Sequence, residues 1–275
     1  MGCDSPVDGS GWPAVVLPVL TRSACLLNLL FQDGTVDLEL ASSVVALDPG
    51  LAFASLQLAN RERAGDSNPI WLFPLAVVAA GRDILLQLVS RAPRLEHLSP
   101  DRRTQLSQYY RHAVLRAAAA QFLSRELGNC DPRKAFLTGL LLELPAMIKA
   151  ALPGPLISPA VLLSSLCGAL PSVVVTAAMA GPASTDRYDP LAPAGALARI
   201  ADSLVGSGSA SLSPAVAPEK LALGPLWRFW EGTDVRQRCC LLGHCRELAS
   251  WVSANLCRMD PWEFMARLER QKSWE

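Results

Sequence analysis

The chain has 275 residues, of which 51% are hydrophobic, and its 25 Lys and Arg residues balance its 25 Asp and Glu residues. This much apolar side chain can bury a sizeable core, which excludes disorder as the main state. A formal net charge of zero provides no overall field to attract a polyanion. The composition therefore argues against an electrostatic nucleic-acid binder and against binding to an anionic membrane surface.

The sequence predicts a cytoplasmic protein with free thiols. Residues 1–13 contain acids but no basic stretch before the first apolar run, and a secretory signal would need one. We expect these residues to form a flexible N-terminus. The longest charge-free stretch, 150–185, is interrupted by five prolines. A membrane-spanning helix needs about 20 apolar residues, so we expect no membrane span but two short buried helices, over 159–169 and 171–181.

Apolar residues recur at helical spacing through the first third of the chain, between polar breaks. Asp37 and Asp48 each precede such a run and are suited to cap a helix N-terminus, and Pro49 suits a first helical position. Residues 61–68 are polar and predict a loop. The expected helices cover 17–31, 37–47, 49–60 and two short stretches around Pro74 and Gly81 that end near Ser90.

The two strongest helix predictions lie in the middle of the chain. Ser99-Pro100-Asp101 and Asp131-Pro132 are helix starts, and apolar stripes follow them to Leu127 and Ala151. Pro145 lies inside the second stripe, so we expect a kink near the middle of that helix.

The last quarter of the chain has a different composition. A helix is predicted over 193–204, and the Gly/Ser-rich stretch that follows predicts a linker over 207–217. Five of the seven tryptophans lie in 218–275, and the apolar stripe from Val235 to Met259 predicts a long helix packed on the rest. We find no strand pattern, so the predicted fold class is all-α, with a helical domain over 14–206 and a C-terminal helical segment over 218–275.

Four stretches, taken in order, carry a family resemblance. Residues 17–60 contain an L-P start, a D-P at a helix start and a final L-A-N. The others are FPLAVVAAGRDILLQLV (73–89), YYRHAVLRAAAAQFLSREL (109–127) and AFLTGLLLELP (135–145). Together they resemble HDOD domains, the HD-related output domains of bacterial signalling proteins, over 14–206. The resemblance implies an HD-like multi-helix bundle, related to the HD phosphohydrolases, with a signalling role.

The resemblance also implies where an HD-type metal site would lie. His112 matches the first histidine, Leu142-Glu143 stands in place of the His-Asp pair, and Asp202 matches the last aspartate. Ala180-Gly181 replaces a further His-His pair, and the chain has only three histidines. We therefore expect no metal, no cofactor and no catalysis, and we interpret these positions as vestigial. We expect His112, Glu143 and Asp202 to lie close together, with His112 hydrogen-bonded in the core or in a groove.

A second group of metal-ligating residue types lies near the C-terminus. Cys240 and His244 are four residues apart, close to Cys239, Cys245 and Cys257. However, Cys239 and Cys245 fall on the apolar stripe, where free cysteine behaves as a small hydrophobe. We interpret this group as helix packing.

The sequence thus favours a non-catalytic regulatory module that acts through a partner protein or a small ligand such as a nucleotide. The alternative is a metal-dependent HD-type phosphohydrolase or phosphodiesterase acting on a nucleotide, with Glu143 as a ligand. Another is a sensor that binds a nucleotide in the old groove without cleaving it. The linker leaves two options open for residues 218–275, which are packing on the bundle of the same chain and reaching a second copy to form a homodimer.

Overall fold

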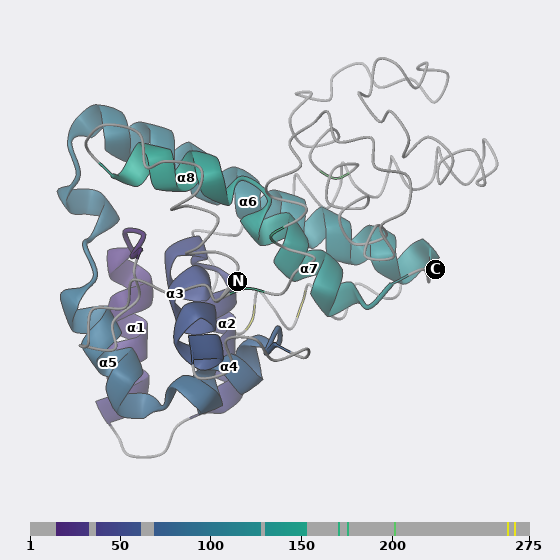
Figure 1. Cartoon of the computed structure of the whole chain (residues 1–275), viewed down its shortest axis with the longest axis horizontal. Coiled ribbons are helices and arrows are strands. Elements are labelled where there is room, and N and C mark those ends of the chain that lie inside the picture. Colours follow the sequence, from purple (N-terminus) through teal and green to yellow (C-terminus); the bar gives the residue numbers. More distant parts are fainter. Residues whose placement is uncertain are drawn as a thin grey trace, which may run out of the picture. The chain divides into compact units, whose positions relative to one another are not determined.

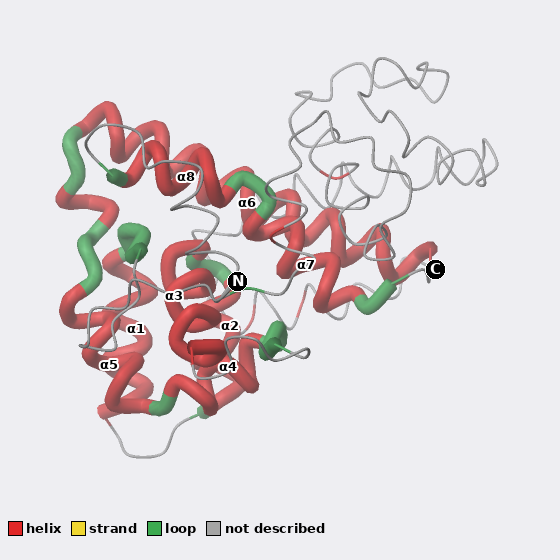
Figure 2. The backbone as a smooth tube through the Cα atoms, in the orientation of Figure 1, coloured by secondary structure: helices red, strands yellow, loops and turns green. Residues whose placement is uncertain are grey.

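The structure is a computed structural model that describes residues 15–32, 37–61, 69–127 and 130–152, with isolated positions at 170, 175, 201, 263 and 267. Helices are the regular secondary structure of these residues, and they contain no strand beyond a single bridge between Val19 and Arg94 (Figure 2). The all-α prediction is confirmed. The α-helices are α1 (Thr21–Gln32), α2 (Leu38–Ala46), α3 (Pro49–Asn60), α4 (Phe73–Ala80), α5 (Arg82–Arg91), α6 (Pro100–Leu127), α7 (Pro132–Leu141) and α8 (Leu144–Ala151), and a short 3-10 helix, η2, covers Leu95–His97.

The chain divides into two compact units. Among the described residues, the first unit contains α1 to α5, α6 as far as Tyr110, and α8, while the second contains the rest of α6 and α7. The predicted domain boundaries at 206 and 218 lie outside the described residues and stay predictions. Of the helices predicted beyond α8, the structure describes only the single residues Val175 and Ala201, which are helical and buried, so the extents of these helices also stay predictions.

Helix α3 is the centre of the first unit (Figure 1). All of its residues except Leu58 are buried, and α2 and α4 both pack against it. Its Gly, Ala and Ser residues are small, so neighbouring helices can approach closely. Helix α1 packs on α2 and α5, and α4 also packs on α2 and α5. Each of the five helices α1 to α5 therefore contacts at least two of the others.

Helix α1 begins later than predicted. We expected a helix over 17–31, but residues up to Leu20 precede it and pair with the segment after α5. The Val19 amide donates to the Pro93 carbonyl at 2.8 Å, and the Leu95 amide donates to the Val19 carbonyl at 3.0 Å. The Glu96 carboxylate accepts from the Thr21 amide and, at 2.6 Å, from the Thr21 hydroxyl. These long-range partners replace the hydrogen bonds that a first helical turn would have made.

The predicted caps of α2 and α3 are confirmed. Asp37 accepts from the backbone amides of residues 39 and 40, and Asp48 accepts from those of residues 50 and 51. The two short helices predicted around Gly81 are also confirmed, as α4 and α5. Gly81 has φ +79°, a conformation that residues with a Cβ rarely adopt, so the chain can turn sharply between the two helices.

The kink predicted near Pro145 is a complete break. Helix α7 ends at Leu141, and α8 begins at Leu144 with Pro145 in its first turn. Proline has no amide hydrogen to donate to the preceding turn and clashes with it, but it fits a helix start without cost. The chain therefore begins a new helix instead of bending the old one.

Among the described residues, no single helix is long and apolar enough to cross a membrane. Two strongly bent helix pairs, α2 with α3 and α4 with α5, pass the same length and composition test together.

Candidate functional site

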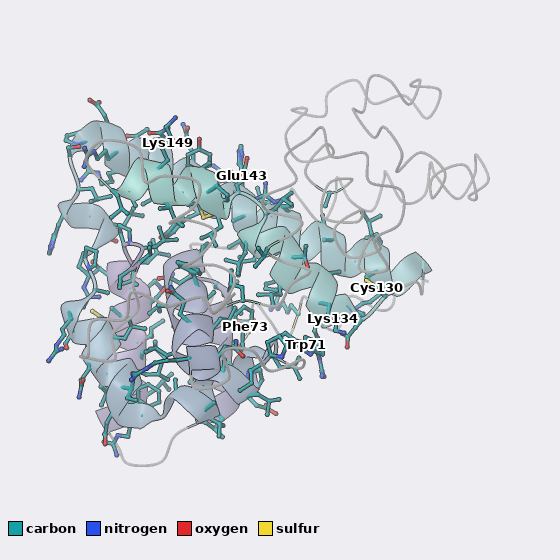
Figure 3. The ribbon with its side chains drawn as sticks, viewed as in Figure 1. Trp71, Phe73, Cys130, Lys134, Glu143 and Lys149 are labelled. Carbon is teal, nitrogen blue, oxygen red and sulfur yellow. The ribbon has the colours of Figure 1, made fainter. Side chains whose placement is uncertain are left out.

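Three of the four predicted HD positions lie in described residues. Leu142 follows the last residue of α7, Glu143 precedes the first residue of α8, and both are half-buried (Figure 3 labels Glu143). His112 lies on α6 and is exposed. It is therefore not a core residue, because Ala113 and Val114 take the buried face at this point of the helix.

The described residues contain no cluster of three or more His, Cys, Asp or Glu side chains that could hold a metal ion. Asp202 lies outside them, as do Ala180-Gly181 and the group around Cys239, Cys240, His244, Cys245 and Cys257. The predicted proximity of His112, Glu143 and Asp202 stays a prediction. HD-type sites hold their metal ion with imidazole and carboxylate ligands. Leu142 has no side-chain atom that can bind a metal ion, so the residues at these positions do not form such a ligand set.

Asp48 makes several hydrogen bonds among the described residues of the first unit. Its side chain is fully buried at the N-terminus of α3. One carboxylate oxygen accepts from the amides of Gly50 and Leu51 at 2.9 and 3.1 Å, and the other accepts from the Leu20 amide at 2.8 Å. The Ser23 side chain also hydrogen-bonds to it. Asp48 therefore caps α3 and at the same time fixes the segment that leads into α1.

Tyr110 completes this group from α6. Its hydroxyl donates to the Pro18 carbonyl at 2.5 Å in a buried position. A Cβ on Gly50 would lie 2.5 Å from that carbonyl oxygen and 2.9 Å from the Tyr110 hydroxyl oxygen, so only glycine fits. The L-P and D-P-G stretches of the sequence thus meet in space, and we refer to Pro18, Asp48, Gly50 and Tyr110 as the Asp48 cluster.

Burial controls the protonation of the Asp48 cluster. It raises the pKa of Asp48 to about 6, although the hydrogen bonds from residues 20, 50, 51 and 23 act in the opposite direction. Burial, assisted by the charge of Asp48, also raises the pKa of Tyr110 well above its usual value. Tyr110 therefore stays neutral and keeps its hydroxyl proton to donate.

Asn60, at the end of α3, holds the chain after the following loop. Its amide nitrogen donates to the Ile70 carbonyl at 2.8 Å, and its amide oxygen accepts from the Ile70 amide at 2.6 Å. This pair of bonds requires both a donor and an acceptor on one side chain, which explains the asparagine of the L-A-N stretch.

In the second unit, α6 and α7 approach closely at Gly139. A Cβ there would lie 2.9 Å from the Ala117 Cα atom and 3.1 Å from the Arg116 carbonyl oxygen. The fully buried Arg116 donates through Nε to the Gly139 carbonyl at 2.7 Å. Gly139 therefore allows the contact between the two helices that the buried guanidinium then secures.

The two cysteines in described residues, Cys25 and Cys130, are free, as expected for both. Cys130, labelled in Figure 3, lies 3.2 Å from the Ser124 hydroxyl oxygen, and burial raises the pKa of its thiol. A thiol with a raised pKa is a poor nucleophile at neutral pH. The surroundings of Cys130 therefore favour a packing role for its thiol over a nucleophilic one.

Helix α4 presents an apolar surface. Pro74, Leu75, Val78 and Ala79 are exposed, and Leu75 and Val78 expose 52% and 57% of their area. The sequence analysis did not identify this surface, although eight consecutive apolar residues, FPLAVVAA, signal it. Such a helix is apolar on every side, so the side that its neighbours α2, α3 and α5 do not cover stays exposed.

The family model of the HDOD domain matches residues 17–152. These residues form an HDOD domain. The match begins at the L-P of the Asp48 cluster and ends one residue after α8, so it spans all the helices described above. A search of curated proteins finds no match to the chain.

Two crystal structures share the fold of the chain, both of the MmoQ response regulator from Methylococcus capsulatus str. Bath. The first is 21% identical, covers 77% of this chain and 94% of the regulator's chain, and has a TM-score of 0.53. The second, of a fragment of the same protein, is also 21% identical, covers 75% and 94%, and has a TM-score of 0.52.

In the HDOD domain, the stretches that carry the resemblance serve the fold. Asp48, Gly50 and Asn60 organise the ends of α3, and Gly139 allows α7 to pack on α6. Sequence analysis used Asp48 as a local cap and Tyr110 as part of an apolar helix stripe, and it did not assign Gly50 or Arg116 a role. Their partners are remote in the sequence, so the only signal was the presence of these residues within the family stretches.

Proposed function

We propose that the chain is a non-catalytic signalling module, in which the HDOD domain uses an HD-like helical scaffold to bind a protein partner or a small ligand. The observation that carries the proposal is Leu142. This half-buried aliphatic residue stands at the break between α7 and α8, where the resemblance expects a metal-binding histidine. An aliphatic side chain cannot ligate a metal ion.

The neighbouring positions support the same proposal. HD-type hydrolysis needs imidazole and carboxylate ligands around a cation, which lowers the pKa of its bound water. Glu143 keeps a carboxylate, but one methylene longer than the expected aspartate, and His112 is exposed on α6. Without the second histidine, the remaining set lacks the ligand that would hold a cation at this break.

Support for the signalling part comes from the HDOD family and from the structural similarity to MmoQ, which is a response regulator. A shared fold does not by itself define a function, since one scaffold can carry several. The signalling role is therefore inferred from the family, and the absence of catalysis from Leu142.

The proposal is tested by metal analysis and a hydrolysis assay on the full-length protein. We expect the purified chain to contain no stoichiometric iron, manganese or zinc. With added Mn²⁺ it should hydrolyse bis(p-nitrophenyl) phosphate and cyclic dinucleotides no faster than the His112→Ala variant. The double variant Leu142→His/Glu143→Asp restores the His-Asp pair and controls for the ability of the scaffold to accept a metal. About one equivalent of metal in the natural protein, lost on His112→Ala, would overturn the proposal.

A further inference from the structure

The apolar surface of α4 has two sides with different environments. The residues that face the core of the first unit are buried: Phe73 (labelled in Figure 3), Ala76, Val77 and Ala80. The residues on the opposite side are exposed: Pro74, Leu75, Val78 and Ala79. We call this exposed set the α4 face.

The exposed apolar residues of the α4 face lie next to one another and are not isolated. Leu75 and Val78 are three positions apart on one helix, so their side chains are neighbours, and each exposes more than half of its area. Single exposed apolar residues are normal in monomeric proteins, whereas contiguous exposed apolar surface is typical of interaction sites.

We propose that the α4 face is the contact between two copies of this chain, related by a two-fold axis. Such a contact places the same surface of both copies together, so an apolar centre meets an apolar centre. The face contains no charged or polar side chain to select a different partner.

Charges at the edge of the face fit this symmetry. Arg82 and Asp83 follow α4 directly across the turn at Gly81, and both are exposed. A two-fold axis beside them brings Arg82 of one copy opposite the partner's Asp83, and the reverse pair forms at the same time. This adjacent pair of opposite charges is thus complementary to itself.

The net charge of the chain also permits self-association, because the charges sum to zero and two copies do not repel each other at long range. The face spans a helix of only eight residues. A stable interface buries about 800 Å² per partner, which is more than this face offers alone, so the dimer is reversible.

This inference goes beyond the proposed function, because it holds whether or not the domain binds a metal. Its test is sedimentation equilibrium of the full chain between about 1 and about 100 μM, a range that detects micromolar dissociation constants. We expect the natural sequence to show a monomer–dimer equilibrium. Val78→Glu buries a carboxylate from each copy in the contact and should weaken dimerisation at least about tenfold.

Two controls make the test specific. Leu29→Glu introduces the same charge at another exposed residue, which lies on α1 with 60% of its area exposed, and should leave the dimer unchanged. Arg82→Glu should weaken the dimer about threefold, and the double variant Arg82→Glu/Asp83→Arg should restore it. Circular dichroism checks each fold, and the Arg82 pair of variants decides the matter if Val78→Glu does not fold.

A natural protein that stays monomeric over the whole range would overturn the inference and indicate a different partner for the α4 face. A dimer that tolerates Val78→Glu in a folded chain, or one that the double variant does not restore, would place the contact elsewhere.

Discussion

The raised pKa of Asp48 predicts how the stability of the protein changes with pH. Its carboxyl group is fully buried, and its pKa is raised from 3.8 to about 6, mainly by burial. The folded state therefore binds a proton more tightly than the unfolded state does. The stability that this proton provides is fully present below the unfolded pKa of 3.8, and it is lost as the pH rises through about 6.

The size of the effect follows from the two pKa values. At about 1.4 kcal/mol per pKa unit, the whole difference amounts to about 3 kcal/mol. Between about pH 4.5 and about pH 7.5, most of this change takes place, and the contribution of Asp48 falls by about 2 kcal/mol. Asp48→Asn removes the titrating group, so the free energy of unfolding of this variant lacks that fall.

The assay is urea unfolding of the natural protein and of Asp48→Asn, followed by circular dichroism across this pH range. Other groups titrate too. Burial raises the pKa of Glu96, but the hydrogen bonds from Thr21 outweigh it and lower the pKa overall, so the contribution of Glu96 is lost as the pH falls. Such effects occur in both proteins and cancel in the difference between them. A difference in unfolding free energy that stays constant with pH would show that the hydrogen bonds to Asp48 offset the effect of burial on its pKa, and would refute the reasoning.

Two further predictions concern contacts between remote segments. Tyr110→Phe removes the hydrogen bond to the Pro18 carbonyl and leaves that buried acceptor without its partner, so we expect a loss of about 1–3 kcal/mol in urea unfolding; an unchanged midpoint would show that the bond contributes nothing. Gly139→Ala places a methyl group 2.9 Å from the Ala117 Cα atom and should cost about 1–3 kcal/mol as α7 moves away from α6. Gly81→Ala has no neighbour within 4 Å and serves as its comparison, since it is strained only through its positive φ; equal stability of Gly139→Ala and the natural protein would contradict the close approach of the two helices.

The helix starts could be predicted because their signals are local. Asp37 and Asp48 cap helices through amides two or three residues away, and Pro49 and Pro132 occupy first turns. The errors occurred where distant residues compete with local ones. Residue 19 pairs with residues 93 and 95, which moves the start of α1 to Thr21. No periodicity within 17–31 could reveal that pairing.

The sequence by itself determined the all-α class, the caps and the membership of the HDOD family. These properties depend on residue identity and on neighbours within a helical turn. The tertiary structure alone decided which polar groups are buried together and which apolar side chains stay exposed. Asp48 is hydrogen-bonded to Leu20, which lies 28 positions away in the sequence, and Tyr110 is hydrogen-bonded to Pro18, which lies 92 positions away. At such separations the local pattern of residues does not indicate which groups will meet. Leu75 and Val77 are equally apolar in the sequence, yet one is exposed and the other is buried, because the packing of α4 on α2 and α3 covers only one side of that helix.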